Sequence, residues 1–436
     1  MKKVFLTIMQ KLIAAKPQSV DEFLRLKKDF AGEFHLSPPS TSTLHAAYHQ
    51  LLKSGLKPVP EIEKMLRRKV VRTNSGISPI TVLTKPYPCP GKCVYCPYEV
   101  TMPKSYLSNE PAAQRALLLR FDPYRQVSER IKSLLTIGHE STKIELIVKG
   151  GTWSSYPPKY QEWFLKRCFD AANHAGSKKI RSSNLAQSQT INERAKCRII
   201  GLTLETRPDR ITPKEVARLR MLGCTRIELG LQNTSDRILK LIERGHTTTD
   251  AKRALKLLRD AGFKTDLHMM PQLPGATPRS DLKMFEELFA DPDYRPDMIK
   301  IYPCVVMRNS ALYEWHQSGK FKPYSDKRLF ETLIKIKTSV PYYCRVSRLV
   351  RDIPGSSIVS GNTITNLRLG LQQEMKARGL ICKCLRCREI GHQESGRWSV
   401  VRGQSTTFFD EAYEASRGVE HFLSFEDPRR TVVFAF

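Results

Sequence analysis

The sequence predicts an α/β fold: a partial (β/α)6 barrel with smaller parts at both ends. Short apolar runs alternate with amphipathic segments from Ile77 to about residue 303, and this alternation is typical of parallel strands joined by right-handed crossovers. The chain of 436 residues is long enough for a large core and one or two appendages. A cysteine-rich loop directly follows the first expected strand, at the end of the barrel where such folds place their chemistry.

Six strands are expected in this barrel, with helices between them. The expected strands are 80–83, 144–148, 198–204, 225–231, 264–270 and 298–303. The expected helices are 111–135, 157–173, 213–222, 234–261 and 279–290. The stretch 176–196 is polar and basic without an apolar period, so we expect a long loop there.

The N-terminal part, residues 1–73, is expected to be a helical and basic segment. Phe5, Met9 and Leu12 recur at helical spacing, and the segment ends in a basic run over 67–72. The formal net charge of the whole chain is +29. Such an excess indicates a polyanionic partner, although a merely solvated basic surface is the alternative.

Composition also favours a cytoplasmic protein. The first residues lack the long apolar core of a signal peptide, and no apolar stretch is long enough to cross a bilayer. Six of the eleven cysteines lie in two tight clusters. Such clusters are typical of metal ligands in a reducing compartment rather than of disulfides. No membrane partner is expected.

The first cysteine cluster predicts an iron–sulfur centre. Cys89, Cys93 and Cys96 have the spacing C-x3-C-x2-C, which is that of radical S-adenosylmethionine (SAM) enzymes. Three thiolates hold three corners of a [4Fe–4S] cluster, and the fourth iron stays open for SAM. A zinc knuckle is the alternative, but zinc sites normally add a second cysteine or histidine pair at a set distance, and none follows.

The ends of the expected strands carry the other candidate site residues. Paired glycines allow close backbone approach, although a structural turn would also explain them. An acidic and a basic side chain at one strand end could hold the ribose and carboxylate of SAM, and a plain ion pair is the alternative. The expected cofactor-binding residues are Lys85, Gly150, Gly151, Thr152, Glu205 and Arg207, and those expected to act in catalysis are Glu205, Arg207, Gln232 and His268.

The second cysteine cluster lies between the barrel and the C-terminal tail. Cys382, Cys384 and Cys387 fall within six residues, which favours a structural zinc site over free thiols. A fourth ligand is needed, and the sequence leaves Cys304, Cys344 and His392 open.

Several independent motifs resemble one known family, the catalytic subunit of Elongator and its single-chain prokaryotic relatives. The resemblance runs in order from about residue 57 to 430 and includes the cysteine loop, Glu205-Thr-Arg207-Pro-Asp209, Arg244-Gly245-His246, Arg351-Asp352-Ile-Pro354 and Glu426-Asp427-Pro428. It implies a radical SAM domain joined to a GNAT-type acetyltransferase domain. The implied activity is carboxymethylation at C5 of the wobble uridine (U34) of tRNA, with acetyl-CoA as the carbon donor. Lys143 matches a family lysine that contacts acetyl-CoA, and we expect it to act in catalysis as well.

The resemblance gives four parts: a tRNA-binding segment (1–73), a radical SAM barrel (74–345), a linker with the second cysteine cluster (346–395) and the start of an acetyltransferase domain (396–436). The glycine-rich turn expected for the CoA pyrophosphate has no match after residue 390, so this last domain is expected to be truncated. Expected partners are the anticodon stem-loop of tRNA and acetyl-CoA; a homodimer or further subunits stay open. The alternatives are another radical SAM reaction, of the coproporphyrinogen oxidase type, or a non-catalytic tRNA-binding protein.

Overall fold

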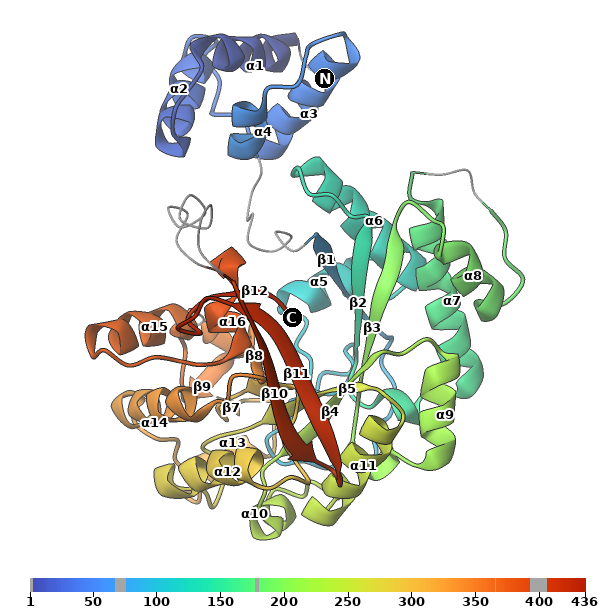
Figure 1. Cartoon of the computed structure of the whole chain (residues 1–436), viewed down its shortest axis with the longest axis vertical. Coiled ribbons are helices and arrows are strands. Elements are labelled where there is room, and N and C mark those ends of the chain that lie inside the picture. Colours follow the sequence, from blue (N-terminus) through green and yellow to red (C-terminus); the bar gives the residue numbers. More distant parts are fainter. Residues whose placement is uncertain (1–2, 67–75, 177–179, 365, 393–405) are drawn as a thin grey trace.

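The computed structural model describes residues 3–66, 76–176, 180–364, 366–392 and 406–436, with only the backbone of His392. Its centre is a curled sheet of seven parallel strands in the order β1-β2-β3-β4-β5-β6-β8 (Figure 1). The strands are β1 (Ile77–Leu83), β2 (Lys143–Lys149), β3 (Arg198–Thr206), β4 (Arg226–Gln232), β5 (Lys264–Met269), β6 (Met298–Ile301) and β8 (Arg345–Arg348). Among the described residues, the edge strands β1 and β8 do not pair with each other, so the sheet forms a partial barrel.

Helices cover the convex face of this sheet (Figure 1). They are α6 (Pro123–Thr136), α7 (Pro158–His174), α8 (Leu185–Asn192), α9 (Pro213–Met221), α11 (Thr248–Asp260), α12 (Pro278–Ala290) and α14 (Asp326–Ser339). Three shorter helices, α5 (Pro111–Leu118), α10 (Asp236–Leu241) and α13 (Leu312–Gln317), belong to smaller hydrophobic clusters. The main hydrophobic core lies between the helices of the convex face and the strands. Apolar strand residues such as Leu146, Leu204 and Leu267 are fully buried there, because alternate side chains of a strand point to the same face.

The concave face of the sheet is polar instead. Residues at the intervening strand positions, such as Glu145, Lys149, Glu228 and Asp266, line a cavity inside the barrel. Each strand therefore alternates between an apolar side against the helices and a charged or polar side toward this cavity. The sheet thus separates the core from a hollow that is built for polar ligands.

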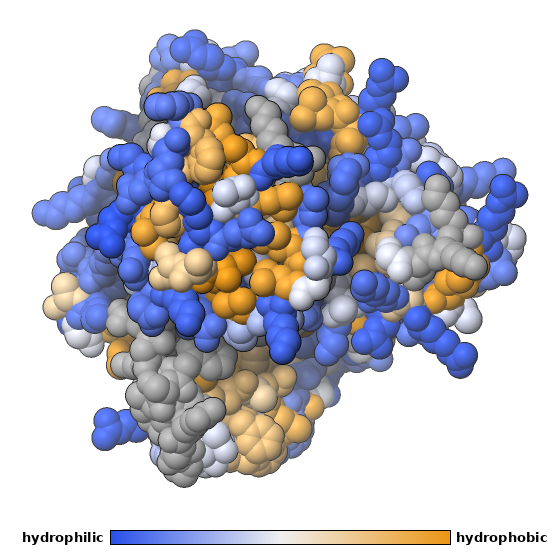
Figure 2. Space-filling view, turned by 90° about the horizontal axis from the view of Figure 1, so that it is seen from above, coloured by the Kyte–Doolittle hydropathy of each residue, from blue (hydrophilic) through white to orange (hydrophobic). Residues whose placement is uncertain are grey.

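The N-terminal helices have a core of their own. They are α1 (Lys3–Ala15), α2 (Val20–Gly32), α3 (Thr41–Lys53) and α4 (Pro60–Leu66). Phe23, Leu44 and Tyr48 are among the residues buried between them, in a cluster separate from the barrel core. Seen from the side of these helices, hydrophobic side chains gather near the middle of the face and hydrophilic ones surround them (Figure 2). The basic run Arg67, Arg68, Lys69 and Arg72 lies outside the described residues.

An antiparallel sheet of β10 (Thr407–Ala415), β11 (Gly418–Glu426) and β12 (Val433–Ala435) packs beside the amino ends of the barrel strands. Helices α15 (Leu367–Ala377) and α16 (Leu385–Arg388) precede it in the chain. The short strands β7 (Val306–Met307) and β9 (Ile358–Ser360) pair with each other elsewhere, in a hydrophobic cluster with Leu107. Arg259 donates a hydrogen bond from Nη1 to Ser416 Oγ (2.7 Å), and the Tyr343 and Tyr413 rings stack 4.0 Å apart. The expected start of the last domain, at residue 396, lies outside the described residues.

The partial barrel is confirmed, and its six expected strands are all present. Several elements differ from the sequence prediction. The expected helix 111–135 is divided into α5 and α6, the expected helix 234–261 is divided into α10 and α11, and helices α13 and α14 were not predicted. A seventh parallel strand, β8, pairs with β6 just beyond the expected last strand. The expected loop 176–196 contains helix α8, so the prediction of a loop was wrong for residues 185–192. No described helix is long and apolar enough to cross a membrane.

Candidate radical SAM site

A cavity of about 1890 Å³ runs along the concave face of the barrel. At the carboxyl ends of the strands it is lined by Cys89, Cys93 and Cys96. The register of β1 and β2 places this loop next to the glycine turn, because Leu83 pairs with Lys149 and each is the last residue of its strand. The loops that follow neighbouring parallel strands therefore meet at one mouth.

The three thiols face this cavity together. An ideal Cβ built on Gly91 would lie 3.5 Å from Cys93 Sγ and 3.6 Å from Cys89 Sγ, so the backbone at Gly91 passes close to both sulfurs. Gly91 N donates to Cys89 Sγ (3.4 Å), and Arg244 Nη1 donates to Cys93 Sγ (3.4 Å). Among the described residues that line the cavity, these three are the only cysteines. Three thiolates without a fourth fit a cluster that leaves one iron open.

The charge of Arg244 prepares Cys93 to be a thiolate. Burial by itself raises the pKa of Cys93, but the neighbouring guanidinium of Arg244 outweighs it and lowers the pKa below its usual value. Burial, followed by the charge of Cys93, raises the pKa of the Cys96 thiol to about 12. A metal cluster would hold both as thiolates, since coordination displaces the thiol proton.

Two buried polar atoms at the mouth have no protein partner. Arg207 donates from Nε to Asp209 Oδ1 (2.8 Å) and from Nη2 to the Gly245 carbonyl (3.1 Å), but its Nη1 has no hydrogen-bond partner among the described residues. Gln232 Oε1 is likewise buried without a partner, and the Gln232 backbone has φ +76°. Buried polar groups are normally paired, so unpaired ones in a cavity indicate the place of a polar ligand.

The glycine turn after β2 is required by close packing. Gly150 has φ +144°, and an added Cβ would lie 1.8 Å from Thr84 Oγ1. Gly151 has φ +91° and lines the cavity together with Thr152. Thr152 Oγ1 lies 3.6 Å from Cys89 Sγ. The turn therefore brings backbone to the edge of the cysteine loop, where a side chain would block it.

A network of buried charges lies deeper in the cavity, centred on Glu228. The ammonium groups of Lys149 and Lys300 pair with Glu228, and His268 Nε2 lies 2.9 Å from Glu228 Oε2. Burial would raise the pKa of Glu228, but the charges of Lys149 and Lys300 lower it well below its usual value. Glu228 therefore stays ionised inside the barrel.

Glu205 belongs to the same network. Its Oε2 accepts a hydrogen bond from the Tyr106 hydroxyl (2.8 Å), and its Oε1 lies 3.7 Å from His268 Nδ1. Glu205, Glu228 and His268 are close enough to share a metal ion. However, Lys149 and Lys300 already neutralise Glu228, so we assign no metal there.

The structure brings together Glu205, Arg207, Gln232, His268, Gly151 and Thr152, which all line the cavity. It places two other predicted residues apart from them. Lys85 is exposed, and its Nζ lies over the Tyr160 ring, 5.1 Å from the ring centre. Lys143 is exposed at the amino end of β2, whereas Lys149 at the carboxyl end reaches the network. Six strand steps separate the two lysines by about 20 Å.

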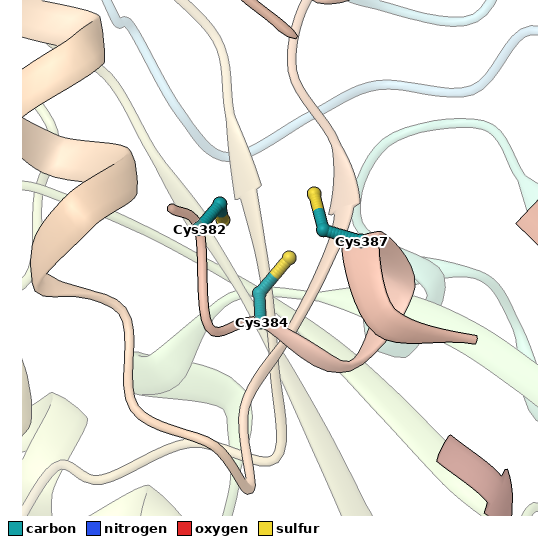
Figure 3. A group of neighbouring side chains, drawn as sticks. All are labelled: Cys382, Cys384 and Cys387. Atoms are coloured by element: carbon teal, nitrogen blue, oxygen red, sulfur yellow. The ribbon is translucent and has the colours of Figure 1, made fainter. Parts of the chain in front are cut away.

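The second cysteine group lies between helices α14, α15 and α16. The sulfurs of Cys382, Cys384 and Cys387 all lie within 4.8 Å of one another (Figure 3). Lys337 of α14 is fully buried, and its Nζ lies 3.5 Å from Cys387 Sγ. Hydrogen bonds from the Cys382 and Cys384 thiols lower the pKa of Cys387. Three converging thiols fit a zinc site.

The three candidates for a fourth ligand differ in position. Cys304 belongs to another hydrophobic cluster and is therefore not part of this thiol group. Cys344 lies beside the thiol group, because the Cys344 carbonyl accepts a hydrogen bond from Leu385 N (3.1 Å). Its own sulfur is not within 4.8 Å of all three thiols. The side chain of His392 lies outside the described part of the chain.

Comparison with known proteins places the chain in a family. The model of the Radical SAM superfamily matches residues 84–288, and that of the Radical_SAM C-terminal domain matches residues 296–377. A tRNA uridine(34) acetyltransferase of Methanocaldococcus infernus is 43% identical over 399 residues, which cover 90% of this chain and 74% of that protein. The chain belongs to the Elongator catalytic subunit family.

Other relatives agree. Elongator complex protein 3 of Homo sapiens is 35% identical over 441 residues, covering 98% of this chain and 78% of that protein. The solved structure of archaeal Methanocaldococcus infernus Elp3 with an N-terminal deletion matches with a TM-score of 0.71 and 39% identity, over 82% of this chain and 76% of that one. The radical SAM barrel of this Elongator-family chain is thus shown by sequence and by structure.

Sequence analysis missed several residues of the site. Tyr106, Lys149, Glu228, Arg244 and Lys300 all line the cavity. A signal for three of them was present, because Lys149, Glu228 and Lys300 are charged residues within otherwise apolar strands. A charge at alternate positions of a buried strand indicates a polar interior face. Tyr106 and Arg244 lie in loops without a hydrophobic period, and the only signal for Arg244 was its place in a motif of the family resemblance, which gave it no role.

Proposed function

We propose that this chain carboxymethylates C5 of the wobble uridine (U34) of tRNA, with acetyl-CoA as carbon donor and SAM as radical source. One observation carries the proposal: Cys89, Cys93 and Cys96 open onto the same cavity as the unpaired Arg207 Nη1 and Gln232 Oε1. The names of the relatives support tRNA uridine(34) as the substrate. C5 of uracil has no useful acid–base handle, so cofactor chemistry must perform the difficult step.

The residues of the mouth take distinct roles in this proposal. Cys89, Cys93 and Cys96 would hold a [4Fe–4S] cluster, which would supply the electron for the reductive cleavage of SAM. Gly150, Gly151 and Thr152 admit the amino group of SAM beside Cys89. Arg207 donates from Nη1 to the carboxylate of SAM, and Glu205 accepts from the ribose hydroxyls. Gln232 and His268 orient the reacting groups, and the cavity walls exclude water.

The tRNA reaches this mouth as a flipped-out base. An unpaired anticodon base can leave its stack at a cost of a few kcal/mol. The N-terminal helices and the net charge of +29 would hold the anticodon stem-loop mainly through its phosphates. A cytoplasmic location agrees with such a substrate.

The acetyl-CoA site is placed at the other end of the barrel. The antiparallel strands β10–β12 lie there, and we assign them to the GNAT-like domain that the family resemblance implies. Lys143 is exposed at the amino end of β2. We assign Lys143 to contact with acetyl-CoA, as the family resemblance implies, and its exposed position away from the cysteine loop is compatible with this role. Phe422 and residues 433–436 line the same cavity as the cysteines, which gives the acetyl group a path between the two ends.

A structural zinc ion at Cys382, Cys384 and Cys387 would tie the linker to α14. Three thiolates around Zn²⁺ carry excess negative charge, and the buried ammonium of Lys337 offsets it. Replacing this ammonium with an apolar chain of similar length, in Lys337→Met, is expected to lower the zinc content of the purified protein. Lys335→Met, on the exposed side of the same helix, is the control and should leave the zinc content unchanged. Equal zinc in both variants would contradict the counter-charge role.

The main proposal is tested by anaerobic reconstitution of the cluster. The protein is incubated with SAM, a reductant, acetyl-CoA and tRNA, and 5′-deoxyadenosine and modified nucleosides are measured by mass spectrometry. We expect both products from the wild-type protein and neither from Cys93→Ser. Cleavage of SAM without a changed uridine would contradict the assigned substrate, and intact SAM with normal iron content would contradict the radical mechanism.

A further inference from the structure

Four aromatic rings form a row beside the two segments that border the cavity mouth. The ring centres of Tyr87 and Tyr156 lie 4.9 Å apart, those of Tyr156 and Tyr160 lie 5.2 Å apart, and those of Tyr160 and Trp163 lie 5.6 Å apart. The angles between successive ring planes are 31°, 22° and 35°. The middle pair is therefore stacked, and the two outer pairs are tilted but closer to face to face than to edge to face. We call these four residues the rim stack.

The middle of the rim stack is fixed and its ends are open. Tyr156 is only 4% exposed, and its hydroxyl donates to the Lys85 carbonyl (2.8 Å) and lies 2.7 Å from Thr84 Oγ1. Tyr160 accepts a hydrogen bond at its hydroxyl from Lys85 N (3.1 Å). In contrast, Tyr87 is 36% exposed and Trp163 is 45% exposed. Packing explains the two inner rings, but it does not explain two large rings left in solvent at the ends.

The position of the rim stack connects it to the proposed radical site. Tyr87 lies two residues before Cys89, and Tyr156 and Tyr160 follow the glycine turn after β2. Both segments border the cavity, which is lined by Cys89, Gly151 and Thr152. A nucleic acid that places one base in this mouth has its neighbouring nucleotides within reach of the segments around it, including the rim stack.

The surroundings of the rim stack are basic. Lys85, Lys92 and Lys159 are exposed and come from the same two segments. The Lys85 ammonium lies 5.1 Å from the centre of the Tyr160 ring. Exposed aromatic rings together with lysines are the combination that binds single-stranded nucleic acid, since bases stack on the rings and phosphates pair with the lysines.

We propose that the rim stack binds an unpaired RNA base next to the base that enters the cavity, by stacking on the exposed ring of Tyr87 or Trp163. This inference rests on the proposed function, because it takes RNA as the substrate. Phosphate contacts alone do not fix which nucleotide enters the cavity. A base stacked on the rim would hold the RNA in one register, so that only the target base faces the cluster.

The test compares two RNAs of equal charge, a hairpin with an unpaired seven-nucleotide loop and a blunt duplex. Tyr87→Leu and Trp163→Leu are each titrated with both RNAs at two salt concentrations. Phe408→Leu is the matched control, because Phe408 is an aromatic residue of β10 that is 54% exposed and lies outside the rim. Circular dichroism checks that the variants are folded.

We expect at least one rim variant to bind the hairpin about ten-fold more weakly, since stacking of one base contributes about 1–3 kcal/mol. Its affinity for the duplex and its salt dependence should be unchanged, because phosphate contacts stay intact. Quenching of tryptophan fluorescence by the hairpin should also diminish in Trp163→Leu. Wild-type affinity for the hairpin in both variants would overturn the rim site and leave the proposed function standing. A wild-type protein that binds neither RNA would overturn both.

Discussion

Glu228 is the residue on which the charged interior of the barrel depends. Its carboxylate is almost fully buried and pairs with the ammonium groups of Lys149 and Lys300. A buried ion pair adds little stability compared with apolar residues, but removal of one partner leaves an uncompensated buried charge. Here one carboxylate pairs with two ammonium groups, so removing its charge takes a partner from both of them.

Replacing Glu228 with glutamine is therefore expected to lower the free energy of unfolding by about 3–5 kcal/mol. The shape of the side chain is kept, so the effect reports charge rather than packing. Urea denaturation followed by circular dichroism measures it. Glu162→Gln is the matched control, because Glu162 is largely exposed and lies 3.8 Å from Arg218. A surface pair of this kind contributes less than about 1 kcal/mol. Equal loss in the two variants would contradict the role given to Glu228.

Sequence patterns predicted those site residues that carry recognisable chemistry. The spacing of Cys89, Cys93 and Cys96 and the glycine pair at Gly150 depend on local chain geometry, which a sequence displays directly. The strand partners of Glu205 and Glu228 come from β2, β5 and β6, so their pairing depends on register. Lys143 shows the limit most clearly: it lies on the same strand as Lys149, but at the opposite end of the barrel.

At the scale of single elements, helix α12 contains near its start a carboxyl group, Asp281, that burial keeps protonated up to about pH 7. Asp281 Oδ2 accepts hydrogen bonds from Gln272 N (2.7 Å) and from the Tyr324 hydroxyl (2.8 Å). Its Oδ1 is buried without a hydrogen-bond partner among the described residues. Burial raises the pKa of Asp281 to about 7, and the two hydrogen bonds oppose this rise only in part.

This raised pKa makes stability depend on pH in a definite direction. Between the ordinary pKa of 3.8 and about 7, the folded state keeps a proton that the unfolded state releases. The free energy of unfolding therefore falls as pH rises through this window, by at most about 1.4 kcal/mol per pH unit. Asp281→Asn should remove this dependence and stabilise the protein relative to wild type at pH 8 more than at pH 5.5.

Urea midpoints at the two pH values measure the effect. Asp260→Asn serves as the control, because Asp260 is about half exposed beside Lys256. A wild-type protein that gains stability from pH 5.5 to 8, with no difference between the Asp281 and Asp260 variants, would contradict the assignment of a neutral Asp281.

Helix α8 and strand β8 are two of the elements that were not predicted from the sequence, and each has a physical reason. Helix α8 has no apolar stripe; its buried residues are Ser188 and Asn192, which bond to Asp170 and Asn173. A helix held by polar contacts leaves no hydrophobic period to detect. Strand β8 is only four residues long and carries three polar side chains, Arg345, Ser347 and Arg348. Its pairing with β6 follows from the curl of the whole sheet rather than from its own residues.

For the whole molecule, one face of the central sheet packs the hydrophobic core and the other face lines the cavity that contains the candidate site. The convex face packs apolar side chains under the helices, whereas the concave face presents the thiols, Arg207 and the network of Glu228 to one cavity. The alternation of strands and helices predicted this architecture well, because crossover geometry leaves few alternatives. The placement of the N-terminal helices and of β10–β12 around the barrel could not be predicted, since it depends on contacts between distant segments.

The central claim is that this cavity joins cluster chemistry to a wobble uridine. The most direct test supplies the reconstituted enzyme with SAM, reductant and acetyl-CoA labelled with ¹³C in the acetyl group. It compares two anticodon stem-loops that differ only in U34 or C34. The account predicts a uridine whose mass includes the label, found in the U34 RNA and absent from the C34 RNA and from Cys93→Ser. If the enzyme cleaves SAM but no label enters the U34 RNA, the account is contradicted.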